Sequence, residues 1–320
     1  MSIEVGPATA PLSNPSLATQ VARLFFDRGM TKVEIATHLG ISRFKVARLL
    51  EGALASGLVR IEYRDAPVED RVLATALEAR FHLDLCAVAT SEDGVTRLAG
   101  SVIDGLIGPT DVVGVAWGST LAAVVREIPS RPASSIEVVQ LAGSSTRFGR
   151  GRDAGELARV LADRLGATHR AIYAPAFVER AALRAALLSE PEVAETVARF
   201  GALDLAIVGV GAMPSADLDA ASSLLRSGVL DDADVARLAA AGAIGDLVVH
   251  PFDAAGRFVA PDLAERAIAI GVEDLRRVRR VVAIASGTRK AAAIRGALST
   301  GVVRMLITDG PTARAVLDGA

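Results

Sequence analysis

Four segments of the chain combine glycines with hydroxyl, carboxylate or cationic side chains, a combination that can bind phosphates and polyols. The first is Gly118-Ser119-Thr120, which follows an apolar run at 112–116 and opens an expected helix. Two hydroxyls and the free backbone N–H groups of a helix start can hold a phosphate. Ser and Thr are also common there as plain helix caps, so both interpretations stay open.

The second segment, residues 143–147 (GSSTR), follows Gln140 and leads into a loop rich in Gly and Arg that ends at Gly155. Hydroxyl groups beside guanidinium groups can close over a polyol phosphate. A flexible, solvated loop explains the same residues equally well. The candidate ligand-binding side chains here are those of Gln140, Ser144, Ser145 and Arg147.

The third and fourth segments are residues 286–290 (SGTRK) and 241–246 (AGAIGD). Gly287 lets the backbone approach a ligand, and Lys290 can supply a positive charge to a phosphate, unless it is an ordinary surface lysine. Asp246 can accept hydrogen bonds from sugar hydroxyls, unless it is an ordinary turn aspartate. The glycine pair Gly209 and Gly211 lacks the spacing of a dinucleotide-binding fingerprint, so NAD is not expected.

Most of these segments follow apolar, strand-like runs that alternate with Ala-rich helical stretches. The runs are at 85–89, 112–116, 136–141, 205–210, 281–285 and 304–308. Such alternation predicts an α/β fold with a parallel sheet that is covered on both faces. Because ligands of open parallel sheets bind beyond the carboxyl ends of the strands, the segments are expected to meet at that edge.

Residues 31–57 (TKVEIATHLGISRFKVARLLEGALASG) have the pattern of a helix-turn-helix. Apolar residues form the inner faces of two short helices, Gly40 supplies the turn, and Ser42 is placed as the N-cap of the second helix. The outer surface of that helix is basic, as in helices that enter the DNA major groove, although an ordinary helical hairpin is the alternative. The candidate DNA-binding residues are Thr31, Ser42, Arg43, Phe44, Lys45 and Arg48.

The flanking sequence completes a winged helix. Residues 21–28 have a helical period, and residues 58–63 (LVRIEY) alternate like a short strand, which we interpret as the wing. Residues 68–81 return to helical spacing, and this helix can pack on the rest of the chain or pair with a second copy. The expected organisation is a disordered tail at 1–16, a DNA-binding domain at 17–65, a linker helix at 66–82 and an effector-binding domain at 83–320.

Composition limits the classes of protein that remain. Residues 1–64 carry eight Lys and Arg against five Asp and Glu, whereas the remainder carries 27 against 32. Cys86 is the only cysteine, which excludes intramolecular disulfides and a cysteine-based zinc site and suits a reducing cytoplasm. No apolar run is long enough for a membrane span, and the first residues do not form a signal peptide. The four histidines show no spacing of a metal or catalytic cluster, so no metal and no cofactor are expected.

Taken together, the motifs resemble those of the sorbitol-operon regulator (SorC) family of bacterial transcription factors, which are related in design to deoxyribonucleoside regulators. The resemblance covers roughly residues 17–319. In the N-terminal part it rests on EIATHLGISRFKVARLLEGALASGLVRI. In the rest of the chain it rests on VGVAWGSTL, VVQLAG, IYAPA, LDLAIVGVGA, GAIGDLVVHPFDAAG, VVAIASGTRKAAAIRGALSTG and MLITDGPTARAVL.

The resemblance implies a winged helix-turn-helix that reads double-stranded operator DNA, joined to a Rossmann-like, sugar-isomerase-like domain that senses a sugar, polyol or sugar phosphate. It implies effector contacts at Gly118, Ser119, Thr120, Gln140, Asp246 and Lys290. The loop at 144–155 does not align with the family pattern. A homodimer or homotetramer without membrane contact is expected, since operators are commonly read twice.

Two rival functions remain open. The body could be a sugar-phosphate isomerase in which Asp246 and Lys290 move protons, but an isomerase has no use for a DNA-binding domain. The chain could also be an architectural DNA-binding protein without a ligand. That function leaves more than two hundred residues, with hydroxyl and glycine residues at the strand ends, without a role.

Overall fold

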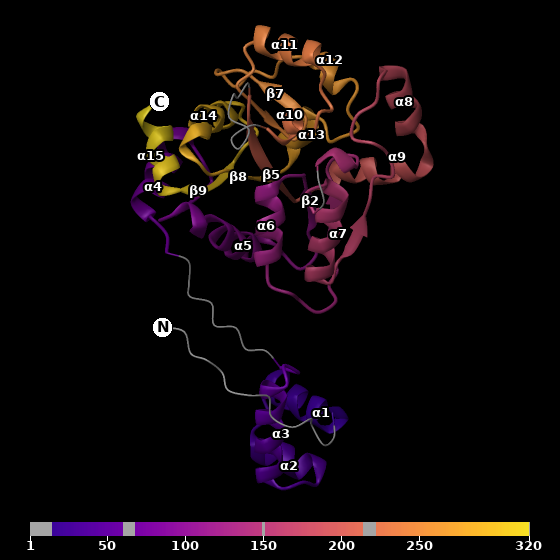
Figure 1. The fold of residues 1–320 in the computed structure, drawn as a ribbon, viewed down its shortest axis with the longest axis vertical. Helices are drawn as coiled ribbons and strands as arrows, with labels where there is room; N and C mark the ends of the chain where they lie inside the picture. The colour runs from indigo at the N-terminus through magenta and orange to yellow at the C-terminus, as the bar shows by residue number, and fades with distance from the viewer. Residues whose placement is uncertain (1–14, 60–67, 149–150, 214–221, 320) are drawn as a thin grey trace. The chain divides into compact units, whose positions relative to one another are not determined.

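The computed structural model describes residues 15–59, 68–148, 151–213 and 222–319 of the chain. Backbone contacts divide the chain into two units, Met1–Ala66 and Pro67–Ala320, which we call the head and the body (Figure 1). Each unit packs around a hydrophobic core of its own.

The head is a bundle of short helices. These are α1 (Pro15–Phe26), α2 (Lys32–Leu39) and α3 (Arg43–Ala55). Their inward faces form a small core in which Val21, Ile35 and Val46 are fully buried. The first helix begins earlier than the predicted start at residue 21, because Leu17 and Ala18 already pack on this core.

The corner between α2 and α3 has the caps that the sequence predicts. Gly40 ends α2 with a left-handed backbone, at φ 65°. Ser42 begins α3, and its hydroxyl accepts a hydrogen bond of 3.2 Å from the backbone N–H of Lys45. Thr31 begins α2 in the same manner, in a capping box with Glu34. The described part of the head is therefore a helix-turn-helix.

Two expectations for the head fall largely outside the described residues. Of the strand expected at 58–63, only Leu58 and Val59 are described. Of the tail expected at 1–16, only the last two residues are described, and they belong to α1.

The body is organised around a parallel sheet. Its strands are β1 (Leu85–Ala89), β2 (Val112–Val115), β3 (Glu137–Gln140), β4 (Thr168–Arg170), β5 (Leu205–Ala212), β8 (Arg280–Ile284) and β9 (Met305–Asp309). They pair in the order β1-β9-β8-β5-β2-β3-β4, and every pairing along this path is parallel. All six predicted runs lie in this sheet, which confirms the predicted α/β class; β4 was not predicted.

Two rows of helices enclose the sheet (Figure 1). One row is α5 (Val95–Leu106), α6 (Ser119–Glu127) and α7 (Ala154–Leu165), and the other is α4 (Arg71–Phe81), α15 (Gly310–Asp318) and α14 (Ala291–Ser299). Neighbours within each row are in contact. Because both faces are covered, the strands are buried along nearly their whole length and read as continuous apolar runs.

Helix α4 lies within the body. It begins only at Arg71, because Glu69 forms an antiparallel bridge with Ala89 at the edge of the sheet. Ala74 and Leu77 are buried where α4 packs on β1 and α15, whereas Val72 on the same helix is 80% exposed. The apolar stripe of this helix is therefore partly buried by its own chain.

A second layer covers the carboxyl ends of the central strands. It contains the antiparallel hairpin β6 (Gly245–Leu247) and β7 (His250–Phe252), with α10 (Ser223–Arg226), α11 (Asp232–Ala240) and α12 (Pro261–Ala264). Strand β6 also pairs with the end of β5, in the antiparallel sense. Leu224, Leu238 and Leu263 form a small core of this layer. The body also contains α8 (Ala181–Ser189), α9 (Pro191–Ala198) and α13 (Val272–Arg277).

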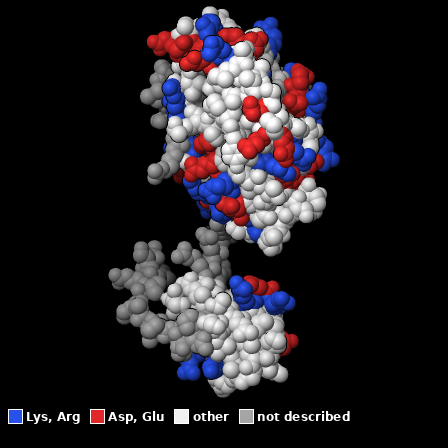
Figure 2. All heavy atoms as spheres, turned by 90° about the vertical axis from the view of Figure 1, so that its right-hand side faces the viewer, with Lys and Arg blue, Asp and Glu red and all other residues white. Residues whose placement is uncertain are grey.

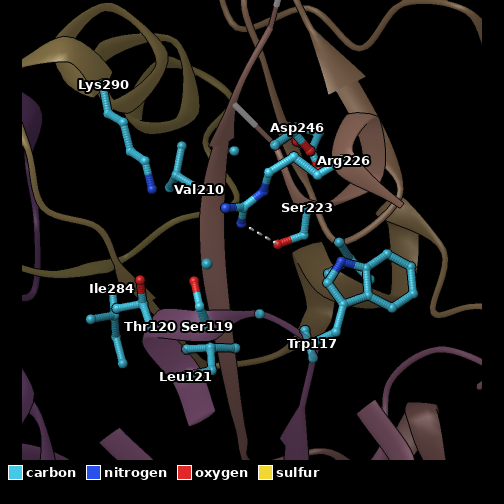
Figure 3. Close-up of a pocket in the computed structure, with 16 residues that line it drawn as sticks. Trp117, Ser119, Thr120, Leu121, Val210, Ser223, Arg226, Asp246, Ile284 and Lys290 are labelled. Carbon is cyan, nitrogen blue, oxygen red and sulfur yellow. Dashed lines mark hydrogen bonds between the residues drawn. The ribbon is translucent and has the colours of Figure 1, made fainter. Parts of the chain in front are cut away.

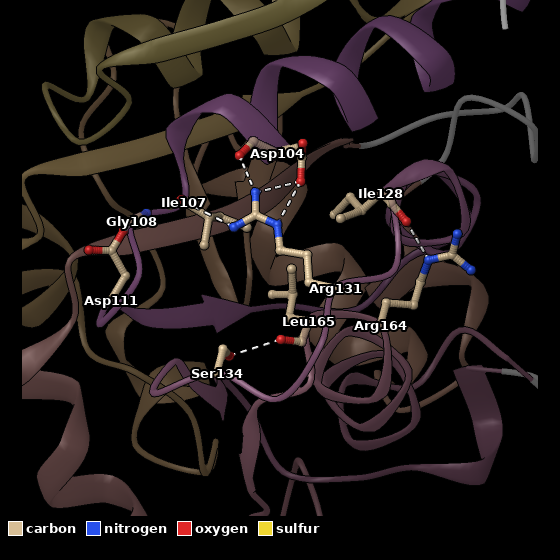
Figure 4. A network of polar contacts seen from close by, with 9 residues as sticks. All are labelled: Asp104, Ile107, Gly108, Asp111, Ile128, Arg131, Ser134, Arg164 and Leu165. Atoms are coloured by element: carbon tan, nitrogen blue, oxygen red, sulfur yellow. Dashed lines mark hydrogen bonds and ion pairs between the residues drawn. The ribbon is translucent and has the colours of Figure 1, made fainter. Parts of the chain in front are cut away.

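At the opposite edge, a polar network ties together the loops that enter the strands (Figure 4). The Arg131 guanidinium pairs with the Asp104 carboxylate and also donates to the Asp104 backbone carbonyl, at 2.6 Å. The Ser134 hydroxyl donates to the Leu165 carbonyl, at 2.8 Å. These contacts bind the loop after α6 to the last turns of α5 and α7, so hydrogen bonds and an ion pair between neighbouring segments stabilise this edge.

The surface of the body carries charges of both signs. Figure 2 shows acidic and basic side chains intermixed over the visible face of the body. Among the described residues, no helix has both the length and the apolar character needed to cross a membrane.

Candidate effector pocket and nucleic-acid interface

A pocket at the carboxyl ends of β2, β5 and β8 gathers polar side chains from segments that are far apart in the sequence. Its empty volume, with the open mouth included, is about 490 Å³, and we call it the carboxyl-edge pocket. Five of the predicted effector residues line it together: Gly118, Ser119, Thr120, Asp246 and Lys290. Figure 3 shows the side chains of Ser119, Thr120, Asp246 and Lys290, which come from different elements.

The floor of the pocket is the start of α6. Gly118 precedes this helix with φ 134°, a conformation that favours glycine, and it has no side chain with which to cap the helix. The hydroxyls of Ser119 and Thr120 point into the pocket (Figure 3). The first N–H groups of a helix have no partner within it and carry its positive dipole end. This floor is therefore suited to an anionic oxygen.

Asp246, on β6, is the buried acid of the pocket. Its side chain is nearly inaccessible, and Oδ1 has no hydrogen-bond partner among the described residues. Burial raises the pKa of Asp246 to about 7, against the opposing effects of the Ser222 hydroxyl and the Lys290 charge. An unpartnered, buried carboxyl oxygen is costly, so a ligand hydroxyl that bonds to it is favoured.

Two cations enter the pocket from different sides. Lys290 ends a short 3-10 turn after β8, and Arg226 ends α10. Both side chains extend into the same space (Figure 3), while Arg226 Nη2 donates to Ser223 Oγ at 3.3 Å. Burial and the Arg226 charge lower the pKa of Lys290, whereas Asp246 and Glu92 act in the opposite direction. An anion that binds between the two cations would relieve their repulsion.

Several lining residues were not among the predicted contacts. Ser222, Ser223 and Arg226 lie on α10 or at its start, and Gly209 and Gly211 lie on β5. The glycine pair was visible in the sequence but had no assigned role. Arg226 could not be predicted from the sequence, because it follows no strand. Only the packing of the second layer places it above the sheet.

Two other predicted residues support the pocket region without lining the pocket. Gln140 is buried, its amide donates to the Ala142 carbonyl at 2.6 Å and to Ser144 Oγ at 3.1 Å, and its Oε1 accepts from the Ile172 N–H at 2.9 Å. These bonds fix the loop after β3. The Gly287 N–H donates to Asp309 Oδ2 at 3.1 Å, which anchors the loop that leads to Lys290.

Ser144, Ser145 and Arg147 line a second, wider hollow, with an empty volume of about 1210 Å³. The Arg147 guanidinium donates to the Gly228 carbonyl at 2.5 Å, and the Ser145 N–H donates to Asp153 Oδ1 at 2.7 Å. Arg147 thus binds the chain two residues beyond α10, the helix that carries Arg226. Residues 149–150 of this loop lie outside the described residues.

In the head, α3 presents its basic residues to solvent. Arg43, Lys45 and Arg48 are exposed, as is the aromatic ring of Phe44. The opposite face, which includes Val46, is buried in the core of the head. Ser42 and Thr31 use their side chains as helix caps. The outer surface of α3 therefore has the charge and the accessibility that a DNA-reading helix requires.

Comparisons with known proteins agree with this arrangement. Residues 66–318 match the Sugar-bind family model, described as "Putative sugar-binding domain". The chain is 31% identical over 314 residues to the erythritol catabolism regulatory protein EryD of Brucella abortus, covering 95% of this chain and 97% of that protein. It is 28% identical over 311 residues to the deoxyribonucleoside regulator of Bacillus subtilis, covering 94% and 97%.

Among solved structures, the full-length sorbitol operon regulator SorC of Klebsiella pneumoniae superimposes with a TM-score of 0.73 at 26% identity, covering 94% of this chain and 98% of that one. The predicted resemblance is thereby confirmed over both units. The chain belongs to the SorC family of transcriptional regulators, whose body is a sugar-binding domain of the Sugar-bind family.

Proposed function

We propose that the body binds a small polyhydroxy compound that carries a phosphate group, and that this ligand changes the affinity of the head for operator DNA. In this proposal residues 17–65 bind DNA, residues 66–82 form the linker segment, whose helix α4 packs on the body, and residues 83–320 bind the effector. The chain acts in the cytoplasm as a homodimer or homotetramer, because two copies of the head can bind the two halves of a pseudo-palindromic operator.

The observation that carries the proposal is the composition of the carboxyl-edge pocket. The start of α6 with Ser119 and Thr120, together with the cations Lys290 and Arg226, suits a phosphate. Asp246 at the side of the same pocket suits a hydroxyl. A ligand that has both groups satisfies both parts of the pocket, whereas a neutral sugar leaves the two cations without an anion.

The names of the relatives point in the same direction. They refer to erythritol, to deoxyribonucleosides and to sorbitol, which are polyols or sugar derivatives. A polyol of four to six carbons or a pentose, in phosphorylated form, is therefore the chemical class that we propose for this chain.

For the head, we propose that Arg43, Lys45 and Arg48 contact the DNA. Lys45→Ala is expected to weaken operator binding and to reduce the salt dependence of the affinity, because each lost phosphate contact removes about one released counterion. Gel-shift titrations at several salt concentrations measure both effects. Unchanged affinity in both Arg43→Ala and Lys45→Ala would contradict this assignment.

The effector proposal is tested with the purified full-length chain and a DNA site selected from a random library. Thermal denaturation is recorded with erythritol, sorbitol, ribose, deoxyribose, their phosphate esters and inorganic phosphate. At least one ester is expected to raise the melting temperature more than its neutral parent does, and the same ester is expected to change the DNA affinity. If neutral compounds stabilise as well as their esters, or if the ester is consumed in steady-state turnover, the proposal is wrong.

A further inference from the structure

The recognition helix α3 carries one large apolar side chain on its solvent face. Phe44 is 80% exposed, although it lies in the second position of a well-capped helix whose inner face is fully packed. Counting about 100° per residue around the helix axis, Phe44 and Arg48 each lie roughly 160° from the buried Val46. The ring therefore adds little to the core of the head.

The surroundings of Phe44 are cationic. Arg43 and Lys45 are its neighbours in the chain, and Arg48 lies one turn further along the same face. The Arg43 guanidinium lies 5.8 Å from the centroid of the Phe44 ring, within the range of a cation–π contact. An aromatic ring among three exposed cations fits a polyanion that also offers an apolar group. Duplex DNA offers such a group in the major groove, the 5-methyl group of thymine.

We propose that Phe44 reads the 5-methyl group of a thymine in each half of the operator, while the flanking cations hold the phosphate backbone. The inference rests on the proposed DNA binding by the head. It goes beyond that function by naming the base and the atom that the side chain recognises. The first turn of the recognition helix is the part that contacts base edges in helix-turn-helix proteins, and Phe44 occupies that turn.

The test uses the full-length protein and a DNA site selected from a random library. Each thymine is replaced in turn by uracil, which removes only the methyl group and leaves all hydrogen-bonding groups of the base unchanged. One uracil position in each half-site is expected to weaken binding by about four-fold, the value of burying one methyl group. With Phe44→Ala, the same replacement is expected to have no effect, because the methyl group has lost its partner.

Two further variants separate a specific contact from a general loss of binding. Phe44→Leu keeps an apolar side chain and is expected to retain part of the methyl sensitivity. Val33→Ala, at a 57% exposed apolar position on α2, is expected to leave the sensitivity to the thymine methyl group unchanged. Circular dichroism checks that the head of each variant is folded.

The outcomes distinguish this inference from the proposed function. Failure of the wild-type protein to bind any DNA would contradict the proposed function itself. Binding to DNA without sensitivity to any thymine methyl group, or equal sensitivity in the wild type and Phe44→Ala, would overturn the role of Phe44 alone.

Discussion

Asp246 and Gly211 face each other across the antiparallel pair formed by β5 and β6, and Asp246 Oδ1 occupies the space that a side chain at position 211 would need. A Cβ at this position would also lie 2.7 Å from both Cβ and Oγ of Ser222. The position of the buried acid therefore depends on a glycine on the neighbouring strand. This relationship joins two residues 35 positions apart, and the missing side chain at Gly211 lets the second layer approach the end of β5 closely.

Replacement of Gly211 by alanine is expected to lower the stability of the protein and to displace Asp246. The added methyl group meets a buried carboxylate and a buried helix cap, so we expect a loss of about 1–3 kcal/mol in the free energy of unfolding. Gly209→Ala is the matched control, because a Cβ at Gly209 meets nothing within 4 Å. Urea denaturation of the ligand-free proteins measures the difference, and equal stability of the two variants would contradict the predicted collision.

Asp246→Asn is expected to change the pH dependence of stability. The pKa of Asp246 is raised by burial from 3.8 to about 7, so the folded state binds the proton more tightly than the unfolded state does. The wild type therefore loses stability as the pH rises from about 4 to about 7, by at most about 4 kcal/mol. Asparagine does not ionise and avoids this loss. The melting temperature of the variant minus that of the wild type is therefore expected to be larger at pH 8 than at pH 5.

The control for this experiment is Asp318→Asn, at an exposed position in the last turn of α15. This variant is expected to follow the wild type at both pH values. A melting-temperature difference between Asp246→Asn and the wild type that is the same at pH 5 and pH 8 would mean that the carboxyl group ionises without cost in the folded protein.

Lys290→Gln and Arg226→Gln are each expected to weaken binding of a phosphorylated ligand by about 10- to 100-fold, the range for loss of one charge-assisted hydrogen bond. Binding of the neutral parent compound is expected to change far less. Isothermal titration calorimetry with the ester and the parent measures this selectivity. DNA affinity without ligand serves as the control, since neither residue belongs to the head. Unaltered affinity of both variants for the ester would place the phosphate elsewhere.

The sequence predicted the sheet well and the pocket only in part. Strands such as β1 and β8 are buried on both faces, so their apolar runs are visible without knowledge of the tertiary structure. Three-residue strands are too short for such a pattern. Residues 241–246 were therefore interpreted without a strand, with Asp246 either as a sugar-binding residue or as an ordinary turn aspartate, although residues 245–247 form β6.

The same reasoning explains which site residues were found. Ser119 and Lys290 lie four and six residues beyond the ends of β2 and β8. The carboxyl ends of parallel strands lie at the same edge of the sheet, so the proximity of these two residues follows from the fold class. Arg226 and Ser222 reach the pocket from the second layer, whose position depends on the packing of Leu224, Leu238 and Leu263. Such packing between distant segments has no local signature in one sequence.

Arg147→Ala is expected to weaken effector binding indirectly. Its guanidinium binds the Gly228 carbonyl, just beyond the helix that carries Arg226. Loss of this bond is expected to cost about 0.5–1.5 kcal/mol, which is at most about 2- to 12-fold in affinity, without changing the preference for the ester over the neutral parent. Arg147→Lys, which keeps a donor, is expected to restore part of the affinity. A loss of ester selectivity as large as in Lys290→Gln would instead support direct contact between Arg147 and the phosphate.

Arg131→Ala is expected to reduce stability without altering the effector preference, because the polar network of Arg131 lies at the edge of the sheet opposite the carboxyl-edge pocket. The substitution leaves the Asp104 carboxylate and the Asp104 carbonyl without their guanidinium partner. The side chains of Arg131 and Asp104 are 28% and 30% exposed, so water replaces part of the lost bonding. We therefore expect a loss of about 1–2 kcal/mol in the free energy of unfolding.

Arg159→Ala is the matched control, because its ion pair with Asp163 is largely exposed and is expected to contribute less than about 0.5 kcal/mol. Urea denaturation measures the stability of both variants, and calorimetry measures their preference for the ester over the neutral parent. A change in this preference in Arg131→Ala would show that the two edges of the sheet are coupled. Equal stability of the two variants would contradict a structural role of this network.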